Sequence, residues 1–292
     1  MTLVENVTRK SMIIRPSGRS TDYISPSFGH GCLFNCTYCY MKRHKPEGLS
    51  IADNYAHILS EINAHAWFAD VEKPNQTHES FITYDISCNE DFALHAKYHK
   101  WEEIFDFFKY HDRAMGSFAT KYVNEDLLKY NPNGKIRIRF SLMPYQFSHL
   151  NNLEPNTSQI LHRIYAINDF IKAGYDVHIN FSPVIVTEDE TWLAAYKFLF
   201  KTVNNGVKDE YKDRVKAEVI FLTHNEKKHQ YNLDNDLLGE DLLWIPHMQE
   251  SKISEYGGHN IRYKHDLKDG YIQQWTELHD EIIPWNTIRY IF

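Results

Sequence analysis

The feature that most constrains this chain is a group of three cysteines within eight residues. Cys32, Cys36 and Cys39 follow one another at the spacing C-x3-C-x2-C, with Gly31 directly before them. Thiolates are soft ligands that suit zinc or an iron–sulfur cluster. A structural zinc site is closed by four protein ligands, whereas three cysteines leave one iron of a four-iron cluster open to a small molecule. The spacing therefore favours one short loop that holds a cubane cluster with a vacant coordination position.

Zinc is the alternative interpretation of this loop, with His30 or His44 as the fourth ligand. Zinc sites of this kind usually pair two halves that each resemble C-x2-C. The remaining cysteine, Cys88, stands alone much later in the chain. A second half is therefore missing, and the pattern favours iron and sulfide over zinc.

Size and charge limit the class of protein. The chain has 292 residues, enough for one large α/β domain, and a net charge of −7. That charge argues against broad, non-specific binding of nucleic acid, which depends on Lys and Arg contacts to phosphates, although a local basic groove is compatible with it. Clustered cysteines do not form a disulfide framework, and no apolar run approaches the ~20 residues of a membrane span. We expect a cytoplasmic protein that does not contact a membrane.

Strands and helices are expected to alternate along the chain. Alternating cations and apolar residues predict a strand over 135–142, and apolar residues at helical spacing predict a helix that begins at Thr157 or Ser158 and ends at Gly174. A helix start is also expected between Ser50 and Asp53. Further strands are expected at 81–86, 117–120, 177–186, 217–223 and 287–292, and further helices at 101–110, 124–130, 189–203 and 267–283. About six strand–helix units favour a parallel sheet covered by helices.

Active-site residues in such folds follow the carboxyl ends of the strands. Cys88 follows the 81–86 strand, in the run Ser87-Cys88-Asn89-Glu90-Asp91. A lone cysteine is usually a small, inert, buried residue. A thiol at this edge of the sheet could instead give a hydrogen atom to a carbon radical.

The cysteine loop resembles the cluster motif of the radical S-adenosylmethionine (SAM) superfamily, in which an aromatic residue, here Tyr38, commonly precedes the last cysteine. This resemblance implies that Cys32, Cys36 and Cys39 hold a [4Fe-4S] cluster and that SAM binds its unique iron. It also implies the fold of that superfamily, an open partial (β/α)6 barrel. We expect an N-terminal extension over residues 1–20 and a single partial-barrel domain over residues 21–292, with a hairpin, helix and strand region at about 245–292.

More specifically, the chain resembles the spore photoproduct lyase family, which repairs a thymine–thymine photolesion in DNA. The resemblance runs from about Ser25 to the C-terminus, and the shared order of its motifs makes it specific. These motifs are Tyr38-Cys39-Tyr40, Cys88 in C-N-E-D beside the family's C-T-S-D, Thr120-Lys121, Arg139-Phe140-Ser141, Glu154-Pro155-Asn156-Thr157-Ser158 beside the family's E-P-G-T-S, and Ala173-Gly174-Tyr175.

The resemblance implies roles for the radical chemistry. Once a deoxyadenosyl radical has taken a hydrogen atom from the lesion, the cross-link fragments and leaves a thymine radical. Cys88 is expected to donate a hydrogen atom to that radical. Tyr40, together with Tyr38, is expected to relay the hole back towards SAM; the alternative for Tyr40 is a packing aromatic residue.

The resemblance also implies a set of SAM contacts. Lys121 and Ser141 are expected to hold the SAM carboxylate, which a cation and a hydroxyl donor can do. Tyr38 and Ser182 are further expected contacts. Glu90 stands where the family has a serine; it is expected to receive the SAM ammonium, with a solvated loop residue as the alternative.

The resemblance also implies a contact with DNA. A damaged base must leave the duplex to reach a buried radical, and the family uses a C-terminal hairpin near an R-Y-G triplet. Here Tyr256 and Gly257 match that triplet, but Glu255 replaces the arginine. The candidate nucleic-acid contacts are Lys252, Tyr256, Arg262 and Lys264. The alternative is an ordinary surface hairpin of mixed charge.

The sequence contains two other groups of residues that could bind a phosphate or a metal ion. Lys135, Arg137 and Arg139 lie on one face of their strand and could meet phosphate or be solvated. His95 and His99 stand four residues apart, but no H-E-x-x-H motif accompanies them, so they are expected to be surface residues.

Three hypotheses follow. The first is a lyase-like repair enzyme, with DNA carrying a thymine photolesion as its partner and a flavodoxin or ferredoxin as electron donor. The second is a radical SAM enzyme of the same fold that acts on another nucleic acid or on a small molecule. The third is a zinc-binding protein without catalytic activity.

Overall fold

Strands and helices alternate along the chain as the sequence predicts. The computed structural model describes residues 3–39, 41, 45, 47–68, 72–253 and 259–292. The predicted strands are β6 (Ile82–Asp85), β7 (Ala114–Thr120), β8 (Ile136–Leu142), β9 (Asp176–Val184), β10 (Lys216–Phe221) and β14 (Ile288–Ile291). They belong to a sheet with the strand order β14-β10-β9-β8-β7-β6-β3-β2. The pairs β6–β7, β7–β8 and β10–β14 are parallel.

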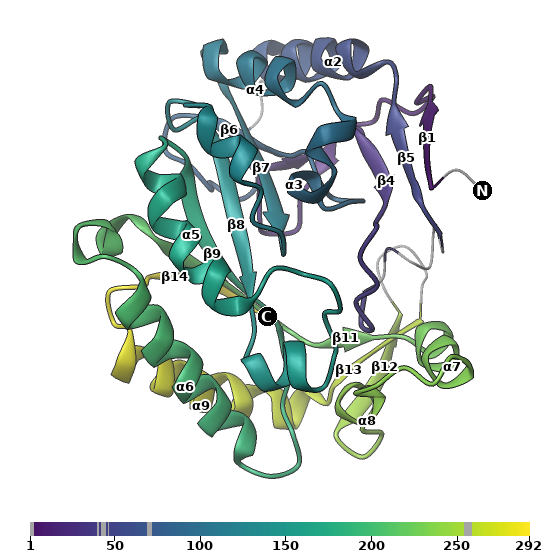
Figure 1. Cartoon of the computed structure of the whole chain (residues 1–292), viewed down its shortest axis with the longest axis vertical. Helices are drawn as coiled ribbons and strands as arrows, with labels where there is room; N and C mark the ends of the chain where they lie inside the picture. Colours follow the sequence, from purple (N-terminus) through teal and green to yellow (C-terminus); the bar gives the residue numbers. More distant parts are fainter. Residues whose placement is uncertain (1–2, 40, 42–44, 46, 69–71, 254–258) are drawn as a thin grey trace. The chain divides into compact units, whose positions relative to one another are not determined.

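The chain divides into two compact units, and the boundary between them within the cysteine loop follows Leu33. Figure 1 labels the helices and strands of both units and colours them along the sequence. The first unit comprises Met1–Leu33, His44–Phe140 and Ala166–His178. The second comprises Phe34–Arg43, Ser141–Tyr165 and Ile179–Phe292. Strands β8 and β9 and helix α5 (Ile160–Lys172) have residues in both.

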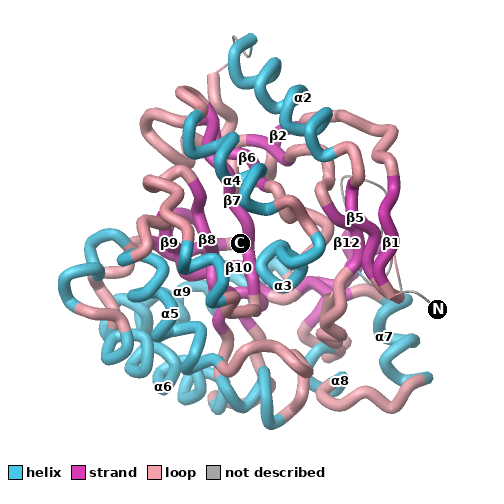
Figure 2. The backbone as a smooth tube through the Cα atoms, turned by 45° about the horizontal axis from the view of Figure 1, so that its top comes forward, coloured by secondary structure: helices cyan, strands magenta, loops and turns pink. Residues whose placement is uncertain are grey.

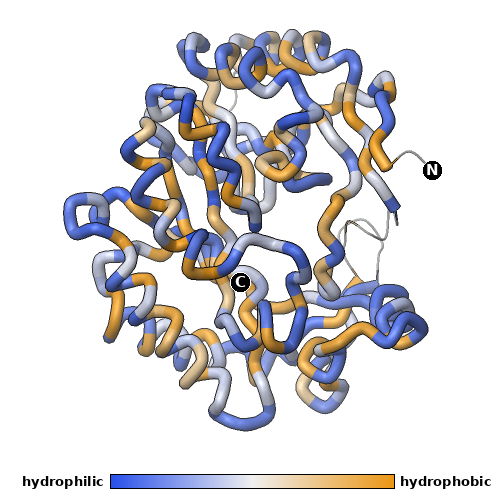
Figure 3. Tube along the Cα trace, viewed as in Figure 1, coloured by the Kyte–Doolittle hydropathy of each residue, from blue (hydrophilic) through white to orange (hydrophobic). Residues whose placement is uncertain are grey.

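The first unit pairs the inner strands β6, β7 and β8 with two short strands, β3 (Tyr23–Ile24) and β2 (Arg15–Pro16). A second small sheet consists of β1 (Val4–Val7), β5 (Leu49–Ala52) and β4 (Gly29–Gly31). Helices α2 (Tyr55–Phe68) and α4 (Trp101–Tyr110) contact each other and β7. Hydrophilic and hydrophobic residues alternate along both helices (Figure 3), and the buried face of α4 consists of Ile104, Phe105 and Phe108. The short helices of this unit are α3 (Phe92–His95), η1 (Ala96–Tyr98) and η2 (Glu125–Lys129).

The second unit contains the helix pair α6 (Thr191–Gly206) and α9 (His265–Ile282) (Figure 2). Their contact is aromatic, since the Phe200 and Trp275 rings meet edge to face with centroids 5.0 Å apart. A three-stranded sheet has the order β11 (Thr223–His224), β13 (His259–Tyr263), β12 (Gln249–Ile253), next in sequence to α7 (Glu226–Asp234) and α8 (Glu240–Leu243). The remaining short helices are η3 (Gln146–Leu150) and η4 (Asp209–Arg214).

The expected helix start at Ser50 is wrong. Ser50 lies in β5, which pairs in parallel with β1 and antiparallel with β4, and the helix begins only at Tyr55. Both partner strands are distant in sequence and are very short, so local propensity could not reveal them. No helix in the described part of the chain is long and apolar enough to cross a membrane.

Two cations of β8 and Lys135, which directly precedes that strand, alternate with apolar residues, but the expectation that they meet phosphate or solvent is wrong. Lys135, Arg137 and Arg139 are each less than 9% exposed. Arg137 Nε lies 2.7 Å from a carboxylate oxygen of Asp176, and Arg139 Nη2 lies 2.7 Å from one of Asp85. Lys135 donates to a backbone carbonyl. Each cation therefore has a hydrogen-bond partner inside the first unit, as a buried charge requires.

We predict that Arg137→Ala destabilises the protein by about 2–3 kcal/mol. The side chain of Arg137 is 3% exposed and that of Asp176 is 23% exposed. Removing one partner leaves the other charge uncompensated, which costs about 3–5 kcal/mol for a fully buried pair and less here. Urea unfolding measures the change. Lys129→Ala, which breaks an exposed pair with Asp126, should leave the urea midpoint unchanged. Equal effects of the two variants would contradict the stabilising role of the pair between Arg137 and Asp176.

Candidate functional site

The turn that carries Cys88 follows β6 and is fixed by its own side chains. Ser87 N donates to Asp85 Oδ1 at 2.9 Å, and Ser87 Oγ donates to the carbonyl of Glu90 at 2.8 Å. Asp91 then caps α3, because its Oδ1 accepts from Leu94 N at 3.1 Å. Cys88 is half-buried within this turn. The thiol is thus presented from a rigid loop at the carboxyl end of a parallel strand, as the sequence predicts.

This turn and the helix α3 that follows it also hold the peptide groups on either side of Cys32. Gly31 N donates to the carbonyl of Asn89 at 3.0 Å, and Leu33 N donates to His95 Nε2 at 3.3 Å. Cys32 itself is 4% exposed. Two of the predicted site cysteines, Cys32 and Cys88, are therefore joined through adjacent backbone in the first unit.

Glu90 and two histidines form a buried group behind this contact. Glu90 Oε2 lies 3.0 Å from His95 Nδ1 and 2.9 Å from His99 Nε2. Glu90, His95 and His99 are 3%, 0% and 9% exposed, so the expectation that the histidines are surface residues and the solvated alternative for Glu90 are both wrong. Gly29 allows this packing, because a Cβ there would lie 2.3 Å from the Glu90 carboxylate.

The direction of these hydrogen bonds gives Glu90 a positioning role. Since His95 Nε2 accepts from a backbone N–H, the ring proton lies on Nδ1 and is donated to Glu90. Burial raises the pKa of the Glu90 carboxyl, but His99 and His95 outweigh it and lower that pKa to about 2. Glu90 thus orients the imidazole that holds Leu33. Its expected contact with SAM stays a prediction.

Asp91 joins the end of β6 to the end of β7. Its Oδ1 accepts from Thr120 Oγ1 at 2.6 Å, and its Oδ2 accepts from Lys121 N at 2.9 Å. The half-buried side chain of Lys121 therefore starts from a backbone position that is bonded to the Cys88 turn. The Thr-Lys motif and the cysteine turn, separated in sequence, share one edge of the first unit.

The remainder of the cysteine loop belongs to the second unit. Cys39 N donates to the carbonyl of Cys36 at 3.1 Å, which closes a turn between the two cysteines. Thr37 lies inside this turn; its N–H donates to the carbonyl of Leu153 at 3.0 Å, and its carbonyl accepts from Asn232 Nδ2 at 2.9 Å. The backbone between Cys36 and Cys39 is thus held on both sides by distant segments.

Tyr38 is attached to a buried ion pair that sequence reasoning did not foresee. Its hydroxyl donates to Glu154, whose other oxygen lies 2.9 Å from Arg163 Nη1. Both charged side chains are fully buried, and Arg163 Nη1 also donates to the carbonyl of Ser141 at 2.9 Å. Burial and the charge of Glu154 raise the pKa of the Tyr38 phenol well above its usual value. Tyr38 and the backbone of Ser141 are linked through one network.

The motif that contains Glu154 was visible in the sequence, although its role was not. Glu154-Pro155-Asn156-Thr157-Ser158 has asparagine where the family has glycine, and Asn156 adopts φ +64°. This left-handed conformation favours glycine, and asparagine is among the few other residues that tolerate it. The departure from the family motif therefore preserves the backbone that brings Glu154 to Tyr38.

The other predicted residues are spread over the second unit. Ser141 is buried in β8, with Oγ 3.5 Å from Asn180 Nδ2, and Ser182 is half-buried in β9. On the hairpin, Lys252 is exposed, while Arg262 Nη2 lies 2.9 Å from Glu250. Lys264 precedes the first residue of α9. Tyr40, Tyr256 and His44 lie outside the described residues.

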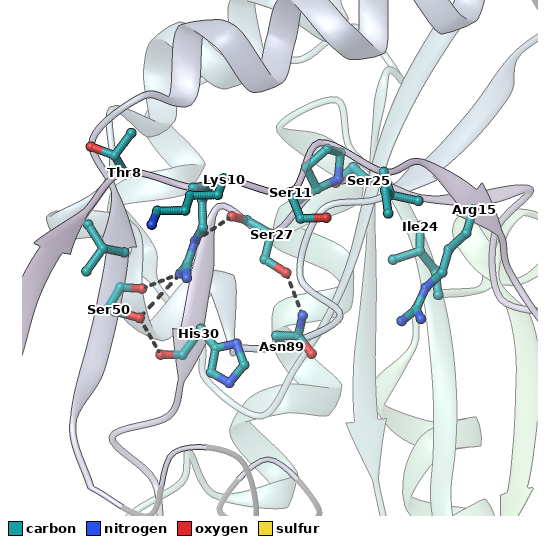
Figure 4. A pocket seen from close by; sticks show the side chains of 14 residues that line it. Thr8, Lys10, Ser11, Arg15, Ile24, Ser25, Ser27, His30, Ser50 and Asn89 are labelled. Atoms are coloured by element: carbon teal, nitrogen blue, oxygen red, sulfur yellow. Dashed lines mark hydrogen bonds between the residues drawn. The ribbon is translucent and has the colours of Figure 1, made fainter. Parts of the chain in front are cut away.

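A cavity of about 550 Å³ opens beside β4 in the first unit (Figure 4). Arg9, Lys10 and Arg15 line it, together with the hydroxyl groups of Ser11, Ser25, Ser27 and Ser50, the imidazole of His30 and the amide of Asn89. Its described lining contains no carboxylate. Figure 4 shows the Asn89 amide bonded to the Ser27 hydroxyl, so the wall of this cavity includes the residue that follows Cys88.

The cysteine thiols fit the iron–sulfur cluster that is predicted to bind them. All four cysteines are present as thiols, and three of them lie on one loop whose backbone is fixed by hydrogen bonds. Three soft ligands on one short loop suit an iron–sulfur cluster that keeps one iron open.

A family model described as spore photoproduct lyase matches residues 1–292. The chain belongs to the spore photoproduct lyase family. Spore photoproduct lyase of Bacillus subtilis (strain 168) is 27% identical over 222 residues, which is 75% of this chain and 61% of that relative. This chain therefore spans less than two thirds of the relative's length.

Solved structures of spore photoproduct lyase show the fold. A mutant lyase with bound AdoMet and dinucleoside spore photoproduct has a TM-score of 0.84 and 19% identity, with 99% of this chain and 82% of that chain covered. A lyase complexed with dinucleoside spore photoproduct has a TM-score of 0.84 and 20% identity over 99% and 82% of the two chains. The predicted open partial barrel, the fold of the family, is confirmed.

The pH dependence of stability tests the Glu90 group. A carboxyl whose pKa falls from 4.5 to about 2 on folding stabilises the protein above pH 4.5, and this contribution is lost as the pH falls towards 2. From about 1.4 kcal/mol per pKa unit, it is of the order of 3 kcal/mol. Glu90→Gln should therefore be less stable than the wild type at pH 6, and the difference should shrink towards pH 2.

Urea unfolding across this pH range measures the difference. Glu102→Gln, at an exposed position of α4, is the matched control and should show no such trend. A constant difference between Glu90→Gln and the wild type at every pH would show that the carboxylate is not held in its ionised form.

Proposed function

We propose that this chain is a radical SAM enzyme that reverses a thymine photolesion in DNA. The observation that supports this most is the pair of hydrogen bonds that the peptide groups beside Cys32 donate to the segment after Cys88, one to the carbonyl of Asn89 and one to the imidazole of His95. A hydrogen-atom donor and a cluster ligand are thereby carried on neighbouring backbone, in a chain that belongs to the spore photoproduct lyase family.

Cys32, Cys36 and Cys39 would hold a [4Fe-4S] cluster, with SAM at the open iron. When bound, these groups supply a 5′-deoxyadenosyl radical that takes a hydrogen atom from the substrate. Lys121 and Ser141 would bind the SAM carboxylate. The protein's part is to fix these positions and to exclude water.

Cys88 would complete the repair. Its S–H bond breaks homolytically while a C–H bond forms on the thymine radical, and the unpaired electron remains on Sγ. Tyr38, with Tyr40, would then return a hydrogen atom to Sγ and pass the hole towards SAM. Glu154 supports this role of Tyr38 by position, because its carboxylate accepts the hydroxyl hydrogen bond and so fixes the phenol, while the hydrogen atom itself goes to Sγ.

The cavity lined by Arg9, Lys10 and Arg15 is the proposed contact for the DNA backbone next to the lesion. Cations and serine hydroxyls are the side chains that most often bind phosphate, and the volume of about 550 Å³ lies within the range of about 300–1,000 Å³ for ligand sites. A flavodoxin or ferredoxin is the proposed electron donor.

Repair of a lesion-containing dinucleotide with dithionite and SAM tests the reaction. Anaerobically purified protein should contain iron and sulfide and release 5′-deoxyadenosine. Cys88→Ala should still cleave SAM, while the yield of restored thymine falls by about tenfold or more because the hydrogen-atom donor is missing. Cys88→Ser keeps the size of the side chain and should behave like Cys88→Ala, since an O–H bond is a poor hydrogen-atom donor. Undiminished repair by either variant would contradict the role of Cys88.

The proposed role of the cavity can be tested separately through the affinity for DNA. The double change Lys10→Ala and Arg15→Ala should weaken binding of a lesion-containing oligonucleotide. It should also reduce the slope of log K against log salt by about 0.7–0.9 per lost phosphate contact. The control removes the same charge elsewhere in the first unit, through Lys97→Ala and Lys100→Ala, both exposed. Equal salt slopes for the two double variants would exclude the cavity as a phosphate site.

A second candidate is a radical SAM enzyme of the same family with a different substrate. Arg262 is paired with Glu250 on the hairpin, Glu255 replaces the family's arginine, and the net charge is −7. These features reduce the positive charge available to DNA. Release of 5′-deoxyadenosine without any repair of the lesion would favour this candidate. Stoichiometric zinc without iron would exclude both enzyme proposals and favour the zinc-binding alternative.

A further inference from the structure

Two histidines and a glutamate of the second unit converge on one point. His224 ends β11, His229 lies in α7, and Glu240 is the first residue of α8. His224 Nε2 lies 2.9 Å and His229 Nδ1 lies 2.5 Å from the same oxygen, Glu240 Oε1. The ligand atoms of all three residues lie within 4.8 Å of one another.

Two members of this group are buried and the third, His229, is half-buried. His224 and Glu240 are 3% and 7% exposed, and the ring of His229 stacks on Trp244 with centroids 4.0 Å apart. The neighbouring Asn232 is 0% exposed, and its Oδ1 has no hydrogen-bond partner within the described chain. An oxygen acceptor buried without a donor costs free energy, so this position is chemically incomplete.

We propose that His224, His229 and Glu240 bind a divalent transition-metal ion of the zinc class. Two imidazole nitrogens and one carboxylate oxygen are a ligand set that zinc uses, with bonds of about 2.0–2.2 Å and a water or further oxygen as fourth ligand. Ligand atoms around a tetrahedral ion lie about 3.3 Å apart at such bond lengths. The two distances from the imidazole nitrogens to Glu240 Oε1 are shorter than this by less than about 1 Å, which rotation of the Glu240 carboxylate can supply. Asn232 Oδ1 or a water would complete the coordination.

The ion would stabilise the cysteine loop indirectly, through the side chain of Asn232. Asn232 Nδ2 donates both to Glu240 and to the carbonyl of Thr37. Thr37 lies between Cys36 and Cys39, so one amide joins the proposed ligand to the loop. A metal that fixes Glu240 therefore also fixes Asn232 and the peptide between the two cysteines. The site is structural, because it acts through Asn232 and contacts no reacting atom.

Metal content tests the proposal independently of radical chemistry. A variant with Cys32→Ala, Cys36→Ala and Cys39→Ala cannot hold a cluster, yet it should still bind about one Zn²⁺ per chain after dialysis, measured by elemental analysis. Adding Glu240→Gln should raise the dissociation constant for Zn²⁺ at least tenfold, because a carboxylate ligand is replaced by a neutral amide that can still accept from the two imidazoles. Zinc that disappears with the cysteines and is unaffected by Glu240→Gln would overturn the proposal.

A matched control is available in the same unit. His247 Nε2 and Glu188 Oε1 form an exposed pair 3.2 Å apart, and His247→Ala with Glu188→Gln should leave Zn²⁺ binding unchanged. Titration of the chelator-treated wild-type chain with Co²⁺, after its thiols have been blocked with iodoacetamide so that the cysteine loop cannot bind the ion, gives a second measurement in case the cysteine variant does not fold. Visible d–d bands of a four-coordinate ion should appear with the wild-type chain and be lost with Glu240→Gln. Equal bands in both would overturn the assignment, and an absence of bands and of Zn²⁺ uptake would show that hydrogen bonds alone hold the three residues.

Discussion

The site depends on two backbone hydrogen bonds that fix the peptide groups on either side of Cys32. A loop with three cysteines has little intrinsic structure, and a cluster requires its ligands in one geometry. Gly31 N and Leu33 N are both held by the segment that carries Cys88, through the Asn89 carbonyl and the His95 imidazole. These bonds restrict the backbone on either side of Cys32, so this part of the loop loses conformational entropy on folding. The position of Cys32 and that of the Cys88 turn within the first unit have the same physical cause.

Both units hold buried carboxylates that are linked to this loop, and each belongs to a specific pair or triad. Glu90 lies between His95 and His99, Glu154 lies between Tyr38 and Arg163, and Glu240 lies between His224 and His229. A buried carboxylate is strongly destabilising unless it is paired and hydrogen-bonded. Such groups gain little over well-packed apolar residues of the same volume, but loss of one partner is costly, so they strongly disfavour alternative arrangements of the side chains they touch. Each of these three carboxylates reaches the cysteine loop, Glu154 directly at Tyr38, Glu90 through His95 and Glu240 through Asn232, so they help to specify its conformation.

The strands and helices of the sheet were largely predictable, because their patterns are local. The alternation over 135–142 corresponds to β8, and the helix expected to end at Gly174 is α5, after which Gly174 adopts φ +99°. The small sheet of β1, β5 and β4 was missed, since its strands have only three or four residues and pair across the chain. His95 and His99 were placed at the surface because helical spacing does not reveal a buried acid that attracts both rings.

By itself the sequence determined the chemistry of this protein: three thiols on one loop, a fourth after a strand, and the order of motifs that identifies the family. Spacing along a chain is sufficient for this, because ligands on one short loop cannot separate. The tertiary structure alone decided which polar side chains serve the loop and which are consumed in the interior. Arg137 and Arg139 resemble phosphate ligands in the sequence but are paired with Asp176 and Asp85, whereas Glu90, Glu154 and Asn232 support the loop from distant positions. Partners of this kind are chosen by burial and by long-range contact, and neither is encoded in local spacing.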